Sequence, residues 1–267
     1  MNILRTYTQA ELSQPELIKF AFGSAVVYTN KSPAKDTPNE DSISLIGLDD
    51  KTAVFMIADG LGGQPSGDAA SKIAVNTMEK SVSQNPDNAN LRDAILDGFE
   101  KANQNIQNKT IGAATTLVAV EYQLGSIRPY HAGDSMVLVT GQRGKIKLQS
   151  VPHSPVGYAV ESGLLDEDEA VHHEERHLVS NVVGSEEMRI EIGSTIRLAK
   201  HDTLIMSSDG LCDNLYIDEI IEITRKGKLE NAAKRLLELA RERMLNPQTG
   251  SPSHADDLSF ILFRPHS

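Results

Sequence analysis

Three acidic turns in this chain each adjoin an apolar run that is typical of a β-strand. They are Asp59-Gly60, Asp209-Gly210 and Asp256-Asp257. A carboxylate at a strand end, with glycine next to it, leaves its side chain and the next carbonyl free to face a hard cation. A single Asp-Gly often marks nothing more than a turn. Three matched contexts instead indicate a divalent-metal site that the fold, rather than one local loop, assembles.

Short runs of β-branched and aliphatic residues predict the strands that carry these turns. The runs cover residues 42–48, 53–58, 115–122, 136–140, 203–207 and 258–263. They do not alternate regularly with helices, as a doubly wound parallel sheet would require. The order favours an α+β fold in which sheets and helices form separate layers.

Helical periodicity appears in three segments. Apolar residues recur at helical spacing over residues 69–78, 91–106 and 229–244. Ser66 is predicted to cap the first helix and Asn90 the second. The third is predicted to stop before Asn246-Pro247. The segment 150–193 differs from these, because it is rich in His and Glu and contains a predicted short helix near residues 166–172.

Composition excludes several classes of function. The 267 residues are 39% hydrophobic, which is enough for a sizeable core, and their net charge of −11 argues against binding nucleic acid through phosphates. No apolar run approaches the length of a membrane span, and the N-terminus lacks the order of a secretory signal. The single cysteine, Cys212, excludes an internal disulfide. We therefore expect a cytoplasmic protein without membrane partners.

The acidic turns belong to a longer series of short motifs. In chain order these are N-E-D (39–41), A-D-G-L-G-G (58–63), A-T-T-L (114–117), A-G-D-S (132–135), S-S-D-G (207–210) and A-D-D-L-S (255–259). Each motif alone is weak, but the set in this order and spacing resembles the PP2C (PPM) family of metal-dependent serine/threonine protein phosphatases, bacterial type. The resemblance extends from about Phe22 to Phe263.

The resemblance implies a fold and a function. It implies a single phosphatase domain over residues 1–267, built as two antiparallel β-sheets packed as a sandwich and flanked by helices in four α-β-β-α layers. The segment at about 150–193 would be a flap-like insertion beside the site, and we interpret its His153 as a satisfied polar residue. The implied reaction is hydrolysis of phosphoserine and phosphothreonine in proteins. A serine/threonine kinase would be the expected cognate partner.

The same resemblance assigns the metal ligands. Asp59 would bridge two Mn²⁺ or Mg²⁺ ions, the carbonyl of Gly60 would bind one, and Asp209 and Asp256 would complete the shell of the other. A phosphate monoester resists attack by water, so its hydrolysis needs an activated nucleophile and neutralised charge. Two ions that share a hydroxide supply both. Oxygen ligands suit these hard ions.

Further acidic residues are assigned around this centre. Glu40 and Asp41 would hold metal-bound waters in the second shell. Asp134 matches a position that helps to bind a weaker third ion in bacterial members. Asp257 stands where the family often has Asn, and we place it in the second shell.

Two positions depart from the family pattern. Members usually carry, five residues before the aspartate of N-E-D, an arginine that grips the substrate phosphate; here that position is Asp36. Lys35, next to it, is our candidate for the phosphate contact, although a lysine lacks the bidentate fork of arginine. The usual G-D-S-R also reads G-D-S-M, with Met136 in place of arginine. This second change is expected to affect packing.

Two alternative functions stay open at this point. The altered arginine position is compatible with a catalytically impaired, phosphatase-like module that binds phosphoproteins. The literal motif H-E-x-x-H, with His173, Glu174 and His177, would on a helix bind Zn²⁺ and indicate a zinc protease. The segment is highly charged, however, and no third ligand motif follows it. A solvated, His-rich flap surface is the plainer interpretation.

Overall fold

Two antiparallel β-sheets form the centre of the molecule. The computed structural model of the chain describes residues 3–61, 66–84, 90–109 and 112–266; Gly62 and Gly63 of the first acidic turn lie outside them. The first sheet has the strand order β1-β4-β5-β6-β7-β10, with β11 also paired to β7. Its strands are β1 (Ile3–Thr8), β4 (Asp41–Gly47), β5 (Thr52–Asp59), β6 (Leu117–Gln123), β7 (Ser126–Ala132), β10 (Glu191–Ile192) and β11 (Ile196–Arg197).

The second sheet has the order β2-β3-β13-β12-β8-β9. Its strands are β2 (Glu16–Phe20), β3 (Gly23–Asn30), β13 (Leu258–Pro265), β12 (Thr203–Ser207), β8 (Met136–Thr140) and β9 (Ile146–Gln149). The C-terminal strand β13 therefore lies in the middle of this sheet, between β3 from the N-terminal part of the chain and β12. This order brings the turns before β13 and after β12 next to each other.

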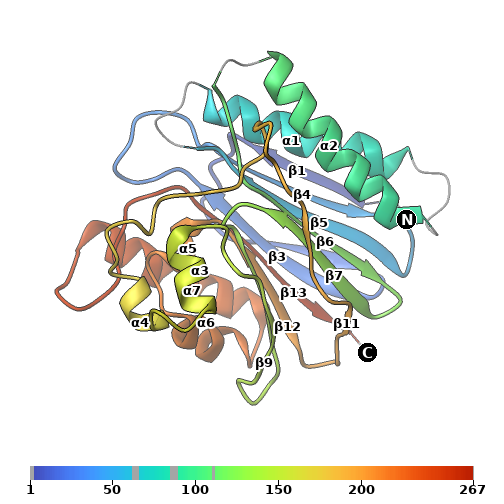
Figure 1. Cartoon of the computed structure of the whole chain (residues 1–267). Helices are drawn as coiled ribbons and strands as arrows, with labels where there is room; N and C mark the ends of the chain where they lie inside the picture. Colours follow the sequence, from blue (N-terminus) through green and yellow to red (C-terminus); the bar gives the residue numbers. More distant parts are fainter. Residues whose placement is uncertain (1–2, 62–65, 85–89, 110–111, 267) are drawn as a thin grey trace.

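Helices cover the outer face of each sheet (Figure 1). The first sheet is covered by α1 (Gly67–Ser83) and α2 (Leu91–Lys109), and the second by α5 (Asp209–Cys212), α6 (Ile217–Thr224) and α7 (Leu229–Leu245). Two further short helices, α3 (Pro155–Glu161) and α4 (Glu167–Ala170), belong to the flap-like segment. The predicted α+β fold of two sheets flanked by helices is confirmed.

Three apolar cores separate these layers. The central core lies between the sheets and contains Phe20, Phe55 and Phe263, which are buried and in mutual ring contact. A second core packs α1 and α2 on the first sheet, and a third packs α5–α7 on the second. Burial on both faces explains why β5 is apolar from Ala53 to Ala58, and β6 from Leu117 to Val120, rather than alternating.

The helix predictions were correct in place and partly wrong in detail. The first helix begins at Gly67, but Ser66 has a left-handed backbone (φ 68°, ψ 38°) and its side chain makes no capping hydrogen bond, so the predicted Ser66 cap was wrong. The third helix ends at Leu245, before Asn246-Pro247, as predicted. The short helix expected near residues 166–172 is α4. None of the helices among the described residues is long and apolar enough to cross a membrane.

Candidate metal centre

The acidic turns meet at one end of the sandwich because strand register places them there. Asp41, the first residue of β4, pairs with Asp59, the last residue of β5. In the second sheet, β12 ends just before Asp209, and β13 begins just after Asp256-Asp257. The two sheets are joined at this end by Ser208, whose hydroxyl donates to Asp41 Oδ2 at 2.9 Å.

The backbone at Asp59 is held from the neighbouring strand. Its amide donates to Thr116 Oγ1 at 3.1 Å, and its carbonyl accepts from the Thr116 amide at 2.8 Å and the Thr115 hydroxyl at 2.7 Å. The next residue, Gly60, packs closely against the backbone of Gly67. A Cβ on Gly60 would lie 2.3 Å from the carbonyl oxygen of Gly67. Asp59 therefore sits on a fixed backbone and has its carboxylate available for other partners.

Asp209 is positioned by tight backbone packing against the turn before β13. A Cβ on Gly210 would lie 1.9 Å from the carbonyl oxygen of Asp257. Asn214, fully buried, donates to the carbonyls of Gly210 at 2.9 Å and His254 at 2.7 Å, and its Oδ1 accepts from the His254 amide at 3.0 Å. Asn214 thereby connects the Asp209 turn to the loop that carries Asp256.

The carboxylates at this end repel one another. Burial, then Asp209 and Asp41, raise the pKa of Asp59 well above its ordinary value. Burial and Asp256 do the same for Asp209. Burial, with nearby carboxylates, raises the pKa of Asp41 to about 8 and that of Asp134 to about 7. Such a cluster favours either protons or a bound cation.

Asp256 differs from these carboxylates. Burial would raise its pKa, but a hydrogen bond from His254 and another from the amide of Asp257 hold the pKa below its ordinary value. The amide of Asp257 lies 2.7 Å from Asp256 Oδ1. Asp256 therefore favours the ionised form, in which a carboxylate can bind a metal ion.

The donor set fits hard divalent ions. Asp41 Oδ1 is a buried oxygen without a hydrogen-bond partner among the described residues. An oxygen that accepts from a cation's bound water, or binds the cation itself, would have this environment. The predicted ligands Asp59, Gly60, Asp209 and Asp256 offer only oxygen, which suits Mg²⁺ or Mn²⁺. Among the described residues, the carboxylate oxygens of Asp59, Asp209 and Asp256 do not all lie within 4.8 Å of one another. Ligands divided between two ions are expected to lie that far apart.

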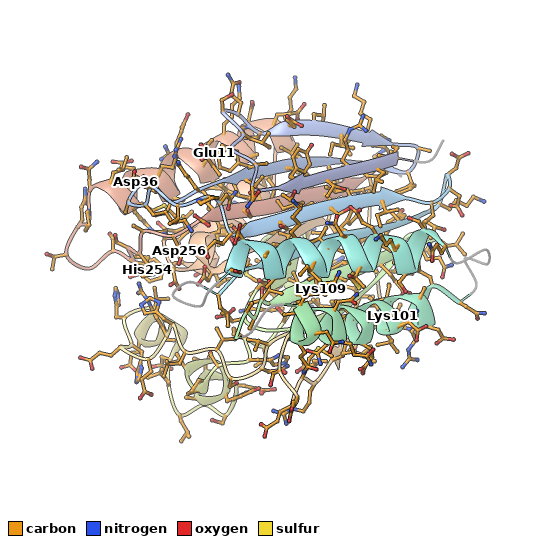
Figure 2. The ribbon with its side chains drawn as sticks, turned by 90° about the horizontal axis from the view of Figure 1, so that it is seen from above. Glu11, Asp36, Lys101, Lys109, His254 and Asp256 are labelled. Carbon is orange, nitrogen blue, oxygen red and sulfur yellow. The ribbon has the colours of Figure 1, made fainter. Side chains whose placement is uncertain are left out.

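Glu40, Asp257 and Lys35 form an ion-pair network beside the acidic turns. Asp257 is buried and accepts from Lys35 Nζ at 2.6 Å and from the amides of Ser32 and Glu40, each at 2.7 Å. Lys35 Nζ also donates to Glu40 Oε2 at 2.8 Å. Asp36, at the family's arginine position, is exposed and lies at the periphery of the molecule (Figure 2). Of the two positions, only Lys35 carries a positive charge beside the acidic turns. Its contact with the substrate phosphate stays a prediction.

A cavity of about 390 Å³ opens beside Asp134 and Asp209. Its apolar wall comes from α3 of the flap-like segment, including Val156 and Val160. Polar groups of Arg176 and Asp213 also line it. The cavity therefore joins the acidic cluster to the flap-like segment, as a substrate pocket with an apolar side would.

Among the described residues, two further groups bring possible metal-ligand atoms within 4.8 Å of one another. One is His131, His153 and Glu191, and the other is His177, Asp213 and His254. His153 Nδ1 lies 3.1 Å from the Gly133 amide and 2.9 Å from Asn181 Nδ2, so it acts as an acceptor. Its Nε2 is then the donor to Glu191 Oε2 at 3.0 Å. His153 is a satisfied polar histidine, as predicted, and has no free nitrogen for a metal.

The zinc protease alternative is not favoured. Helix α4 ends at Ala170, and the residues from His173 to His177 form turns rather than a helix. His173 Nδ1 instead accepts from the amide of Glu175 at 3.1 Å. The two histidines therefore do not share the helical face that an H-E-x-x-H zinc site needs.

Sequence reasoning missed Ser208 and Asn214, both fully buried. Each holds two segments of the site together, Ser208 across the sheets and Asn214 between the turns. The first lies in S-S-D-G, where serine beside an acidic turn was a usable signal. Asn214 stands in the turn between α5 and α6, where the sequence offers no such signal.

Comparison with known proteins relates this arrangement to one family. The family model described as Protein phosphatase 2C matches residues 31–247. A putative protein phosphatase 2C-type of Streptococcus pyogenes is 27% identical over 218 residues, which are 78% of this chain and 88% of that protein. The serine/threonine phosphatase structure of S. agalactiae has a TM-score of 0.77 at 24% identity, covering 91% of this chain and 99% of the other.

A second similar structure is that of the catalytic domain of the serine/threonine protein phosphatase PstP, in complex with two manganese ions. Its TM-score is 0.70 at 19% identity, with 100% of both chains covered. At these identities the two structures establish the fold.

Proposed function

The chain belongs to the protein phosphatase 2C family, and from this premise we propose that it hydrolyses phosphoserine and phosphothreonine in proteins with two bound Mn²⁺ or Mg²⁺ ions. The observation that carries the proposal is the convergence of buried carboxylates from both sheets, with raised pKa values, at one end of the sandwich. The cognate partner would be a serine/threonine kinase that adds the phosphate. The two manganese ions in the PstP structure support the choice of cofactor.

In this proposal Asp59, Asp209 and Asp256 hold the ions, together with the carbonyl of Gly60. The bound ions would supply the attacking hydroxide and neutralise the phosphoryl oxygens. Asp41, anchored by Ser208, would orient water through Oδ1, which has no hydrogen-bond partner within the described part of the chain. Asp134, which lines the cavity, is the candidate ligand of a weaker third ion.

The flap-like segment shapes the substrate pocket in this proposal. Its helix α3 forms the apolar wall of the cavity beside Asp134 and Asp209. An apolar wall would accept the methylene or methyl group of the phosphorylated side chain, and it would exclude water from the reacting phosphate. Residues 1–267 would act as one catalytic unit, with residues 150–193 as its insertion.

The direct test is release of phosphate from a phosphothreonine peptide by metal-stripped protein. We expect turnover only after Mn²⁺ or Mg²⁺ is added, because without the ions nothing would supply the attacking hydroxide or neutralise the phosphoryl oxygens. Equal turnover in chelator would contradict the metal-dependent mechanism. A folded protein that binds Mn²⁺ but releases no phosphate would favour the phosphoprotein-binding module instead.

Lys35 is predicted to contribute to binding of the substrate phosphate. In Lys35→Met we expect KM to rise about tenfold with a smaller change in kcat, because one point charge near the phosphate is lost. The measurement is steady-state kinetics at saturating Mn²⁺, with the thermal midpoint recorded alongside.

Lys35 also pairs with buried Asp257, so a purely structural role must be distinguished. A structural role would lower the thermal midpoint and kcat while leaving KM unchanged. The control is Lys31→Met, because Lys31 forms a more exposed pair with Glu11 at 3.4 Å. We expect parent-like kinetics for that variant.

A further inference from the structure

Three potential metal ligands meet beside the acidic cluster from separate parts of the chain. His177 belongs to the flap-like segment, Asp213 follows α5, and His254 lies in the loop before β13. One ligand atom from each lies within 4.8 Å of the other two. The two imidazole rings face each other, with their centroids 4.1 Å apart. Figure 2 shows His254 next to Asp256, on the side of the molecule where the flap-like segment lies.

The backbones of these ligands are already fixed. The amide of His254 and its carbonyl are both bonded to the side chain of buried Asn214. The amide of Asp213 donates to the carbonyl of Asp209 at 2.8 Å. On the flap side, Arg176 Nη2 donates to the carbonyl of Ser253 at 3.3 Å, next to His254. Little reorganisation would be needed to bind an ion, which favours affinity.

The separation of His177 and Asp213 suits a tetrahedral ion. His177 Nδ1 lies 3.4 Å from Asp213 Oδ2. Two ligands at 2.0–2.1 Å from a tetrahedral Zn²⁺ are separated by about 3.3–3.4 Å. The pair is therefore spaced as neighbouring ligands of zinc would be, and not as a short hydrogen bond.

The local charge also leaves room for a cation. Arg176 Nε is 3.6 Å from Asp213 Oδ2, too far for a hydrogen bond, and it has no hydrogen-bond partner among the described residues. The negative charge of the Asp213 carboxylate is thus only partly compensated by Arg176 in the metal-free protein.

We propose that His177, Asp213 and His254 form a binding site for one Zn²⁺ or a similar borderline ion, next to the two-ion centre, because His254 Nε2 also lies 3.5 Å from Asp256 Oδ2. Two imidazoles and one carboxylate prefer Zn²⁺ to Mg²⁺ or Mn²⁺, in contrast to the all-oxygen set of the acidic cluster. The bound ion joins the flap-like segment to the loop that carries Asp256. Of the H-E-x-x-H motif, only His177 takes part, and its partners come from elsewhere in the fold.

The test measures zinc binding directly and does not depend on phosphatase activity. Full-length protein, saturated with Mg²⁺, is titrated with Zn²⁺ by calorimetry. We expect one zinc equivalent whose affinity falls at least ~10-fold in His177→Ala and in His254→Ala, because each substitution removes a direct ligand. His177 is exposed, so its variant is expected to fold normally.

Two matched variants control for non-specific binding by histidine. His173→Ala removes an exposed histidine of the same segment, and His201→Ala removes an exposed histidine elsewhere. Both variants should keep the parent's affinity for zinc. Co²⁺ used in place of zinc should give visible absorption bands in the parent and in both controls. Parent-like zinc affinity in His177→Ala and His254→Ala would overturn the proposal, and so would an equal loss in His173→Ala.

With zinc bound, the flap-like segment should become harder to cleave. Limited proteolysis between residues 171 and 180 is expected to slow at least ~10-fold on addition of Zn²⁺, because the ion ties His177 to the protein core. The slowing should be absent in His254→Ala, although the protease target itself is unchanged there. Slowing of the same size in that variant would contradict the proposed ligand set.

Discussion

Asp59→Asn is expected to lose at least about 10³-fold in kcat while it keeps the parent fold. The asparagine preserves the shape of the side chain but removes the negative charge that is proposed to bridge the two ions. The backbone contacts with Thr115 and Thr116 do not involve the carboxylate, so they remain. Phosphate release from a phosphothreonine peptide at saturating Mn²⁺ measures the loss.

The stability of this variant provides an independent check. In metal-free protein, burial and then the nearby Asp209 and Asp41 raise the pKa of Asp59, so its negative charge is unfavourable there. Removing it should leave the thermal midpoint equal to or above that of the parent, whereas added Mn²⁺ should stabilise the variant less than the parent. Asp97→Asn, on the exposed face of α2, should match the parent in both measurements. Near-normal activity in Asp59→Asn would contradict the assignment of the site.

The buried strands were predictable because both of their faces are covered. Predicted residues 136–140 and 203–207 coincide with β8 and β12, which are apolar runs bounded by turns. Strands at sheet edges were missed, and so were β3 and β7, which lie inside their sheets. The edge strand β9 is mostly exposed and polar, and β10 and β11 have only two residues each. Their conformation depends on pairing with β7 or β8, which is not encoded in a local pattern.

The site was predictable to the extent that its chemistry is local in sequence. Asp59, Asp209 and Asp256 each stand at a strand end, and the register of the sheets explains why strand ends meet. The contacts that hold them are long-range: Ser208 reaches Asp41, and Asn214 reaches His254. The prediction that Ser66 caps α1 was wrong because Ser66 has a left-handed backbone. The usual N-cap residue is extended.

Gly210→Ala is the second substitution expected to have a large effect. An added Cβ would lie 1.9 Å from the carbonyl oxygen of Asp257, a backbone atom that no side-chain rotation can move away. Relief requires α5 to separate from the turn before β13. We expect a loss of about 2–3 kcal/mol in stability, at the upper end of the cost of overpacking. Urea unfolding of metal-free protein measures this loss.

The same displacement should reduce activity, because it separates Asp209 from Asp256 within one proposed coordination shell. A misplacement of about 1 Å can cost about 10²-fold in rate, and we expect a loss of at least that size in kcat with weaker Mn²⁺ binding.

The matched control is Gly141→Ala, where the nearest atoms to an added Cβ lie at 3.5 Å or more. Gly141→Ala should retain parent activity and should not destabilise the protein. If Gly210→Ala behaved like Gly141→Ala, the contact between the two turns would not set the geometry of the metal centre. A loss confined to Gly210→Ala would mean that glycine is required there because two backbones must touch to bring the carboxylates of α5 and the β13 turn onto the same ion.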